Sequence, residues 1–382
     1  MFKLEEVCSL IHESVKTKAI AKDAYVSTEN MMPNREGIKF SSNIPDVKTV
    51  QAYRQDDILV SNIRPYFKKI WHADRDGGCS NDVLVFRANE GVLPDYLYYA
   101  LATDDFFAYA TATAKGTKMP RGDKNAIMQY QIPDHTISEQ RKITGILKEL
   151  DRKRAVNCRI NDNLEQQAQL LYHKWFETKQ MTNFPKSWRI ATLKEVVTIS
   201  KKSFNPAKEP QTMLEHYSIP AFDESHFPIF ESSANIKSNK FVIDDSCFMI
   251  SKLNPTTKRV WKPYCLTQNA VCSTEFIVYK AKDKAMSDFL YSVINSSSFS
   301  KFMCSHVTGS TGSRQRTKPL DTLNYRFLVP TALEIARYQN IVSPIFTQIK
   351  ENAIENDKLK RLRDHLLPKL MSGEINIPNI HF

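Results

Sequence analysis

The 382-residue sequence lacks the common signatures of catalysis. It has no GxxxxGKS/T or GxGxxG segment and only 10 glycines, which argues against a P-loop ATPase and a dinucleotide-binding turn. HExxH and GxSxG are absent, and the nearest matches to the Asn/Asp-Pro-Pro-Tyr segment of amino-methyltransferases, Asn205-Pro206 and Asn254-Pro255, continue with Ala and Thr. The nine histidines are scattered without the spacing of metal ligands. We therefore expect no active site, metal or other cofactor in this chain.

Two acidic pairs could be imagined as catalytic carboxylates. Asp56-Asp57 and Asp244-Asp245 each stand just before a strand-like apolar run. Because Asp is common in turns that lead into strands, we interpret both pairs as turn residues.

Cysteine is sparse and shows no pairing pattern. The odd count and wide spacing, with no CxxC, argue against a disulfide framework and a zinc site. They indicate reduced, mostly buried thiols in a cytoplasmic protein. No signal peptide and no apolar run near 18 residues is present, so no membrane span is expected. The seven are Cys8, Cys79, Cys158, Cys247, Cys265, Cys272 and Cys304.

Acidic residues are fewer than basic residues. Lys and Arg number 53 against 42 Asp and Glu, which gives a formal charge of +11 and a pI near 9.1. An excess of this kind favours a polyanionic partner, usually nucleic acid, although a merely basic soluble protein has the same composition.

Residues 138–176 have the composition of a long helix, with no proline and one glycine. Apolar residues recur every seven positions at Ile143, Leu150, Leu164 and Leu171, and Asn157 fills the one gap in that row. This pattern is typical of a helix whose seam packs against a partner helix.

The partner helix is predicted in residues 334–371 of the same chain. When the two segments are aligned with an offset of 195 residues, Leu164 matches Leu359 and Asn157 matches Asn352. Because the first helix leaves the first globular half and the second leaves the second half, the pair must be antiparallel if the seams bury each other. Asn157 and Asn352 would then approach one another and fix the helix register; the alternative is that both face solvent.

The two globular halves share six landmarks in the same order, at shifts between 189 and 197 residues. Regions 20–55 and 203–240, between landmarks, have little in common. We therefore predict that one scaffold occurs twice in the chain and carries a different variable surface in each half. The landmark pairs are 4–7 with 193–196, 58–65 with 248–255, 84–86 with 276–278, 94–110 with 287–302, 116–121 with 309–314, and 132–133 with 329–330.

The predicted fold class is α+β: two mixed α/β globular domains separated by a long antiparallel two-helix coiled coil, with an internal pseudo-two-fold duplication. Residues 94–110 and 287–302 are each predicted to form a core helix. The expected boundaries are 1–136 for the first domain, 137–180 for the first long helix, 181–332 for the second domain, 333–373 for the second long helix, and 374–382 for a tail packing near the first domain.

Basic and short polar residues cluster in two loops of each half. Lys and Arg with Ser, Thr and backbone amides suit phosphates and base edges, and aromatics are interleaved (Tyr66, Phe67, Trp71; Trp261, Tyr264). The alternative is a solvated basic rim with those aromatics in the core. The candidate DNA-binding residues are Arg64, Lys68, Lys69, Lys115, Thr117, Lys118, Arg121 and Lys124 in the first half, and Lys252, Lys258, Arg259, Lys262, Ser310, Thr311, Ser313, Arg314, Gln315, Arg316 and Lys318 in the second.

The ordered set of these features resembles a known family. The loop at 116–121, Ile132-Pro133, the segment SEQRKI at 138–143 and the segment HLLPKLMSGEI at 365–375 are together similar to the specificity (S) subunit of type I restriction–modification systems. The resemblance covers the whole chain. One departure is the segment 336–339, ARYQ, where a Glu-Gln pair is common, which predicts a looser start to the second helix.

The resemblance implies that each globular half is a target recognition domain that reads one half of an asymmetric bipartite DNA site. The helix pair would set the spacer and dock two methyltransferase (M) subunits, which methylate adenine with S-adenosylmethionine. Restriction (R) subunits, with ATP- and Mg²⁺-dependent activities, would join them, and this chain would have no catalysis of its own.

Two other classes of function stay open on the sequence. The chain could itself be a nuclease or methyltransferase with an unusual motif. It could also be a coiled-coil organiser that binds RNA, another acidic partner or DNA without sequence preference.

Overall fold

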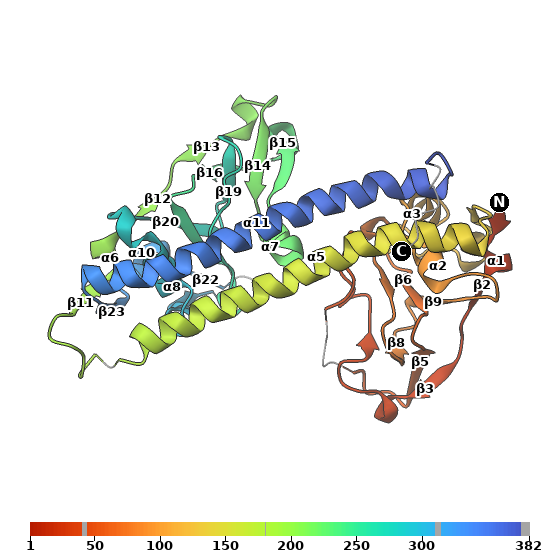
Figure 1. Cartoon of the computed structure of the whole chain (residues 1–382), viewed down its shortest axis with the longest axis horizontal. Helices are drawn as coiled ribbons and strands as arrows, with labels where there is room; N and C mark the ends of the chain where they lie inside the picture. The colour runs from red at the N-terminus through yellow and green to blue at the C-terminus, as the bar shows by residue number, and fades with distance from the viewer. Residues whose placement is uncertain (40–43, 180, 310–314, 376–382) are drawn as a thin grey trace. The chain divides into compact units, whose positions relative to one another are not determined.

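The computed structural model describes residues 1–39, 44–179, 181–309 and 315–375. The chain divides into two compact units: unit 1 is Met1–Arg154 with Lys358–Phe382, and unit 2 is Ala155–Asp357. Each unit contains one globular domain and one stretch of each long helix, α5 (Ile137–Tyr172) and α11 (Ala332–Met371) (Figure 1).

The domain of unit 1 is built on two four-stranded sheets. Their strand orders are β2-β9-β6-β7 and β3-β5-β8-β4, and β1 pairs with β10 in a separate ladder. Strands β4 and β8 are parallel. The elements are β1 (Phe2–Lys3), α1 (Leu4–Val7), β2 (Cys8–Leu10), β3 (Ser14–Lys16), η1 (Thr17–Ala19), β4 (Tyr25–Val26), β5 (Thr49–Tyr53), β6 (Ile58–Ser61), η2 (Pro65–Phe67), β7 (Ile70–His72), β8 (Gly77–Cys79), β9 (Val83–Ala88), α2 (Pro94–Leu101), α3 (Asp104–Ala112), α4 (Lys124–Met128) and β10 (Gln131–Ile132).

Strand β6 separates two cores in unit 1. Successive side chains of a strand point to opposite faces. Ile58 and Val60 pack with helix α2 and with Leu147 of α5, whereas Leu59 packs with Tyr53 of the second sheet. The first sheet is therefore buried on both faces, between the helices and the second sheet.

The domain of unit 2 has sheets of order β12-β20-β17-β18 and β13-β16-β19-β14-β15, with the ladders β11-β23 and β21-β22. Its elements are η3 (His173–Glu177, a π-helical turn), β11 (Arg189–Thr192), α6 (Leu193–Val196), β12 (Val197–Ser200), β13 (Ser203–Phe204), η4 (Pro206–Lys208), β14 (Met213–Tyr217), α7 (Ile219–Ser225), β15 (Ile229–Ser232), η5 (Ser233–Asn235), β16 (Lys240–Val242), β17 (Cys247–Ser251), β18 (Val260–Trp261), β19 (Ala270–Ser273), β20 (Phe276–Ala281), η6 (Lys284–Met286), α8 (Ser287–Ile294), α9 (Ser297–Ser305), β21 (Val307–Thr308), β22 (Arg316–Thr317), α10 (Pro319–Thr322) and β23 (Arg326–Val329).

The predicted duplication is confirmed by strand topology. The order β12-β20-β17-β18 repeats β2-β9-β6-β7, and β13-β16-β19-β14 repeats β3-β5-β8-β4, including the one parallel pair. Regions 20–55 and 203–240, which share little sequence, thus share a strand framework. Unit 2 adds α7 and β15 at the edge of its second sheet.

The predicted core helices at 94–110 and 287–302 are wrong as single elements. Each is two helices, α2 and α3 in unit 1 and α8 and α9 in unit 2. Thr103 and Ser296 start the second helix of each pair, because their hydroxyls accept hydrogen bonds from the Phe106 and Phe299 amides at 3.3 and 3.1 Å. An N-cap of this kind starts a new helix rather than continuing the old one.

Both long helices begin at a capping box in which threonine and glutamate bond reciprocally. The Thr136 amide donates to Glu139 at 2.8 Å, and the Thr331 amide donates to Glu334 at 3.0 Å. Such a box satisfies amides that have no partner within the helix. The second helix keeps this capping box despite the departure at 336–339, and Tyr338 within that segment is fully buried.

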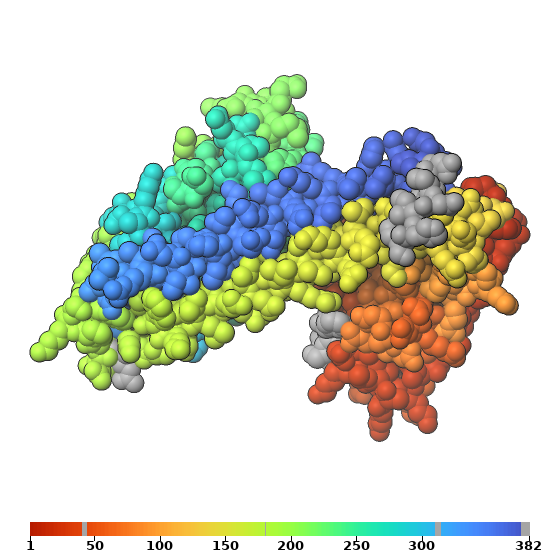
Figure 2. All heavy atoms as spheres, viewed as in Figure 1, coloured from red at the N-terminus to blue at the C-terminus, as the bar shows by residue number. Residues whose placement is uncertain are grey.

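In unit 2 the stretches of α5 and α11 run antiparallel and side by side (Figures 1 and 2). Asn157 and Asn352 are 1% and 7% exposed, so the solvent-facing alternative is wrong. They are not bonded to each other: Asn157 donates to Asn356 at 3.0 Å and to Glu355 at 2.7 Å, and Asn352 donates to Asn161 at 2.8 Å. Because Asn161 and Asn356 are also 195 residues apart, the two Asn–Asn contacts are equivalent.

In unit 1 the same antiparallel pairing continues through apolar and charged contacts. Ile143 and Leu147 of α5 share a core with Leu367 and Leu370 of α11. Ile375 packs on this core; residues 376–382, the rest of the predicted tail, lie outside the described residues.

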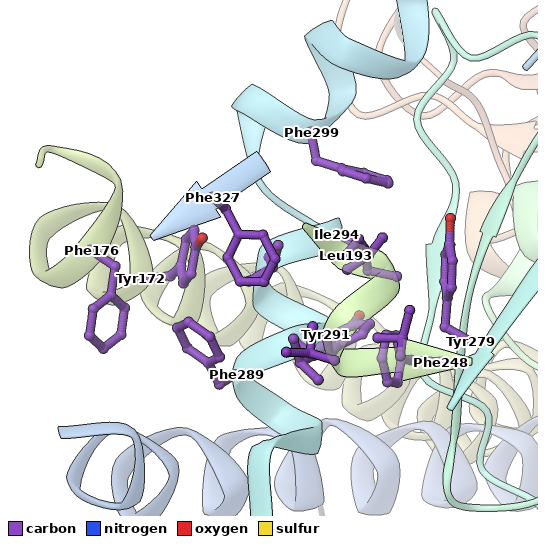
Figure 3. Packing of buried hydrophobic residues seen from close by; sticks show 14 of the residues in the cluster. Tyr172, Phe176, Leu193, Phe248, Tyr279, Phe289, Tyr291, Ile294, Phe299 and Phe327 are labelled. Atoms are coloured by element: carbon purple, nitrogen blue, oxygen red, sulfur yellow. The ribbon is translucent and has the colours of Figure 1, made fainter. Parts of the chain in front are cut away.

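The main core of unit 2 joins the end of α5, helix α8 and the start of α11 (Figure 3). The Phe289 ring centroid of α8 lies 6.0 Å from that of Tyr172 at the end of α5 and 6.3 Å from that of Tyr338 of α11. The domain is therefore anchored to both helices by aromatic packing.

All seven cysteines lie in described segments, and none forms a disulfide. Cys8, Cys79, Cys247 and Cys272 are buried, and burial raises the pKa of the Cys8 thiol to about 12. No helix among the described residues is long and apolar enough to cross a membrane.

Candidate nucleic-acid interface

Most of the predicted DNA-binding residues fall on two loops that adjoin in each unit; Lys124 begins helix α4 and Lys262 follows β18, just outside these loops. The strand-exit loop follows β6 or β17 and comprises residues 62–69 in unit 1 and 252–259 in unit 2. The glycine loop comprises 114–123 in unit 1 and 309–318 in unit 2, of which 310–314 lie outside the described residues.

Backbone hydrogen bonds hold the two loops of unit 1 together. Gly122 donates to the Asn62 carbonyl at 3.1 Å, and Arg64 donates to the Pro120 carbonyl at 2.8 Å. The Asn62 amide in turn donates to the Asp82 carbonyl at 2.8 Å, just before β9.

Unit 2 has the equivalent of each of these three backbone hydrogen bonds. Thr317 donates to Lys252 at 3.1 Å, Asn254 donates to Gln315 at 2.9 Å, and Lys252 donates to Glu275 at 2.9 Å. Because backbone groups make these bonds, the arrangement tolerates different side chains at each position.

Arg64 and Asn254 occupy the same left-handed conformation, with φ of 49° and 48°. They are 190 residues apart, and each precedes a proline. The left-handed conformation costs a residue other than glycine about 1–2 kcal/mol of conformational free energy. The hydrogen bonds between the two loops must therefore hold the residue in it. The strain is thus a property of the shared loop and not of one residue type.

The structure corrects the pairing of the two arginines. Ile63 bridges to Arg121, and its counterpart Leu253 bridges to Arg316. Arg316, not Arg314, therefore takes the place of Arg121.

Each of these arginines contacts an acid just before a sheet strand. Arg121 lies 3.1 Å from Asp82, and Arg316 lies 3.0 Å from Glu275. The arginine side chains remain 56% and 43% exposed, so each guanidinium is oriented by a carboxylate and still accessible. Neither acid was predicted, because no sequence motif marks it. The position of each acid directly before β9 or β20 was the signal that could have indicated it.

The other predicted residues of unit 1 differ in accessibility. Thr117, Lys118 and Lys124 are exposed, and Lys115 is exposed and paired with Asp123. Lys68 bonds Asp104 at 2.7 Å, and Lys69 donates to the Thr28 carbonyl at 2.6 Å. Burial lowers the pKa of Lys69. Tyr66 and Phe67 are exposed.

Three predicted residues of unit 2 are held by other groups of the protein. Arg259 binds Asp223 at 2.6 and 2.8 Å, Lys262 pairs with Asp288, and Lys258 donates to the Asn295 carbonyl at 2.5 Å. The aromatics interleaved with them, Trp261 and Tyr264, are buried.

Few predicted residues of unit 2 therefore reach the surface on the two loops. Lys258 and Lys318 are exposed, while Lys252, Arg259, Gln315 and Arg316 are half-buried. Ser310, Thr311, Ser313 and Arg314 lie outside the described residues.

The acidic pairs have structural roles in the folded chain. Asp57 is 1% exposed and binds Arg87 through both oxygens at 2.7 Å. Asp244 accepts the Ser246 amide at 3.1 Å and pairs with Lys280, and its pKa is lowered to about 2; burial alone would raise it, but these partners outweigh burial. Both precede a strand, as predicted.

No protein-family model matches the sequence. Sequence relatives nevertheless span nearly all of it. The chain is 24% identical to the type I restriction enzyme HindI specificity subunit of Haemophilus influenzae, covering 98% of this chain and 99% of that protein. It is 23% identical to the type I restriction enzyme MjaIX specificity subunit of Methanocaldococcus jannaschii, covering 76% and 71%.

A solved structure supports the fold. The S subunit of a type I restriction-modification system from M. genitalium superposes with a TM-score of 0.57 at 15% identity, covering 99% of this chain and 96% of that one. The resemblance is thereby confirmed: along nearly its whole length the chain is similar in sequence to specificity subunits of type I restriction enzymes, and it shares the fold of one such subunit.

Proposed function

We propose that this chain is the DNA sequence-specificity subunit of a type I restriction–modification system. Each globular domain reads one half of an asymmetric bipartite site, and the helix pair sets the unspecified spacer between the halves. One observation carries the proposal: the two units repeat one loop framework, bond for bond, and fill it with different side chains.

Arg121 and Arg316 are the residues we place in direct contact with DNA. An accessible guanidinium that a carboxylate orients suits the O6 and N7 atoms of guanine or a phosphate. Thr117, Lys118 and Lys318 lie on the same loops and Lys124 begins the adjoining helix α4; all four suit phosphate contacts. Arg259 and Lys262, held by Asp223 and Asp288, are assigned to the fold of unit 2.

Catalysis belongs to partner subunits in this proposal. The helix pair would dock two methyltransferase subunits and, with them, the restriction subunits. S-adenosylmethionine, ATP and Mg²⁺ would be held by those partners.

A map of modified adenines tests the proposal. The chain is co-expressed with the methyltransferase subunit encoded with it, in a host without adenine methylation, and the DNA is read by long-read sequencing. We expect one split motif with two unlike halves and a fixed gap, absent when this chain is omitted. Absence of any motif, with both proteins well expressed, would contradict the proposal and favour an RNA-binding or non-specific organiser, which competition between duplex DNA and RNA would identify.

Turnover by the purified chain alone decides the enzymatic alternative. The chain is incubated with DNA, Mg²⁺ and S-adenosylmethionine. Neither cleavage nor methyl transfer is expected, and either one would overturn the assignment of catalysis to partners.

A further inference from the structure

A short hairpin in unit 1, residues 31–38, connects the strand-exit loop to the helix pair. Met31 bridges to Ile38, and the Met32 amide donates to the Gly37 carbonyl at 2.8 Å. Asn34 and Arg35 at its tip have φ of 57° and 64°. Two successive left-handed residues are uncommon, so strong contacts must hold the tip.

One side of the tip is bonded to the strand-exit loop. The Asn34 and Arg35 amides donate to the Phe67 and Lys68 carbonyls, both at 2.9 Å. Asp104 binds the side chains of both Arg35 and Lys68. The tip and the loop that follows Arg64 therefore form one connected piece.

The other side of the tip is bonded to both long helices through one carboxylate. Glu36 accepts from Lys360 of α11 at 2.7 Å and from Arg154 of α5 at 3.1 and 3.3 Å. The three side chains are only 18%, 30% and 16% exposed. Burial would raise the pKa of Glu36, but the charges of Arg154 and Lys360 outweigh it and lower that pKa, so the carboxylate is ionised at neutral pH.

Unit 2 does not repeat the two basic residues that hold Glu36. At the positions of Lys360 and Arg154, 195 residues away, stand Glu165 and Ile349, and both line a cavity of about 180 Å³. The second domain contacts α11 instead through Phe227 and Tyr264, which pack on Ala353. The residues that form the Glu36 bridge are therefore particular to unit 1.

From this geometry we infer that Glu36 is a positioning residue: it fixes the DNA-reading loops of the first domain at one angle on the helix pair, and so fixes where the first half-site lies along the spacer. The inference rests on the proposed function. Glu36 itself touches no DNA in this scheme. It acts through the hairpin on the strand-exit loop and, through the Arg64–Pro120 bond, on the glycine loop.

Glu36→Gln tests the inference, because it keeps the volume of the side chain and removes its charge. The co-expressed complex is presented with duplexes that carry the native spacer or a spacer changed by one base pair in either direction. We expect the preference for the native spacer to fall by about tenfold, the effect of losing one charge-assisted hydrogen bond. The sequences of both half-sites stay the same.

Glu13→Gln is the matched control. Glu13 is also paired with two arginines of unit 1, but Arg87 lies in β9 and Arg54 directly follows β5, so neither is on the long helices. It should leave the spacer preference unchanged. Lys360→Met should relax the spacing as Glu36→Gln does, and the double variant should add little to either.

Three outcomes separate the inference from its premise. An equal loss of methylation at every spacer would mean that Glu36 is merely structural and would overturn the inference. An unchanged spacer preference would overturn it as well. If the wild-type complex shows no split motif, the proposed function itself has failed.

Discussion

Arg121 and Arg316 are equivalent residues with different acidic partners, one in each domain. If each reads a base, Arg121→Ala should weaken binding at one half-site by about 1–3 kcal/mol, and Arg316→Ala should do so at the other. Binding of the full complex to duplexes substituted at each half-site measures this.

The control for the arginine variants is Arg75→Ala, because Arg75 is a half-buried arginine of unit 1 that pairs with Asp23 and Asp74 outside both loops. It should bind as wild type does. A loss that is equal on all sequences would mark Arg121 or Arg316 as a phosphate contact.

Glu165 is an ionisable residue that the fold disfavours in its charged form. Burial, followed by the charge of Asp162, raises its pKa, and Lys258 only partly opposes this. Because the folded-state pKa is above the unfolded one, the ionised group destabilises the fold as pH rises through these values. Glu165→Gln should therefore raise the Tm at pH 7, by about 2 °C, and the gain should vanish near pH 4.

Thermal unfolding at the two pH values checks the Glu165 prediction. Glu351→Gln, at an exposed position of α11, serves as the control and should change the Tm little at either pH. A gain that is equal at both pH values would show that charge is not the cause.

At the scale of elements, the helix seam of unit 2 has a polar centre of four asparagines. A buried Asn in a seam lowers stability but selects one register, because other registers leave its amide without partners. Asn157→Ala should lower the free energy of unfolding by about 1–3 kcal/mol, since it removes the two hydrogen bonds by which Asn157 joins α5 to Asn356 and Glu355 of α11. Denaturant unfolding of the full chain measures the loss.

Asn163→Ala is the matched substitution for the seam, because Asn163 is an exposed asparagine of the same helix. This substitution should lower the free energy of unfolding far less than Asn157→Ala does. If both variants lost the same stability, helix propensity rather than the seam contact would be the explanation.

At the scale of the whole molecule, the helices should act as a ruler. Arg159 and Ile354 are 195 residues apart and lie midway between the two Asn–Asn contacts. Inserting seven residues after each keeps the seam and lengthens both helices by about 10 Å. The spacer should then grow by at most about three base pairs, at 3.4 Å each.

The adenine methylome of the insertion variant measures its spacer. The two half-site sequences should be unchanged. Altered half-sites with an unchanged gap would contradict the ruler. Insertion in one helix alone is the control, and it should abolish the motif because the seams no longer match.

Several features followed from the sequence because they depend on local or periodic patterns. The seven-residue repeat predicted both long helices, and the matching order of landmarks predicted two copies of one scaffold. The split of residues 94–110 into α2 and α3 was missed, since Thr103 was treated as one residue of a helical pattern and not as the start of a helix.

The candidate interface was predicted only in outline. Local composition located the two loops in both halves, but it treated every Lys and Arg there alike. Whether a cation is free or paired depends on a carboxylate far away in sequence, as Asp223 is from Arg259.

The sequence by itself thus determined the duplication, the helix pair and the places of the loops, because periodicity and order along the chain carry that information. Only the tertiary structure decided that Arg316 is the counterpart of Arg121, that Lys262 is bound to Asp288, and that Glu36 joins the first domain to both helices. Each of these is a contact between segments distant in sequence, and the strength of a charge–charge contact depends on distance and burial, which exist only after folding.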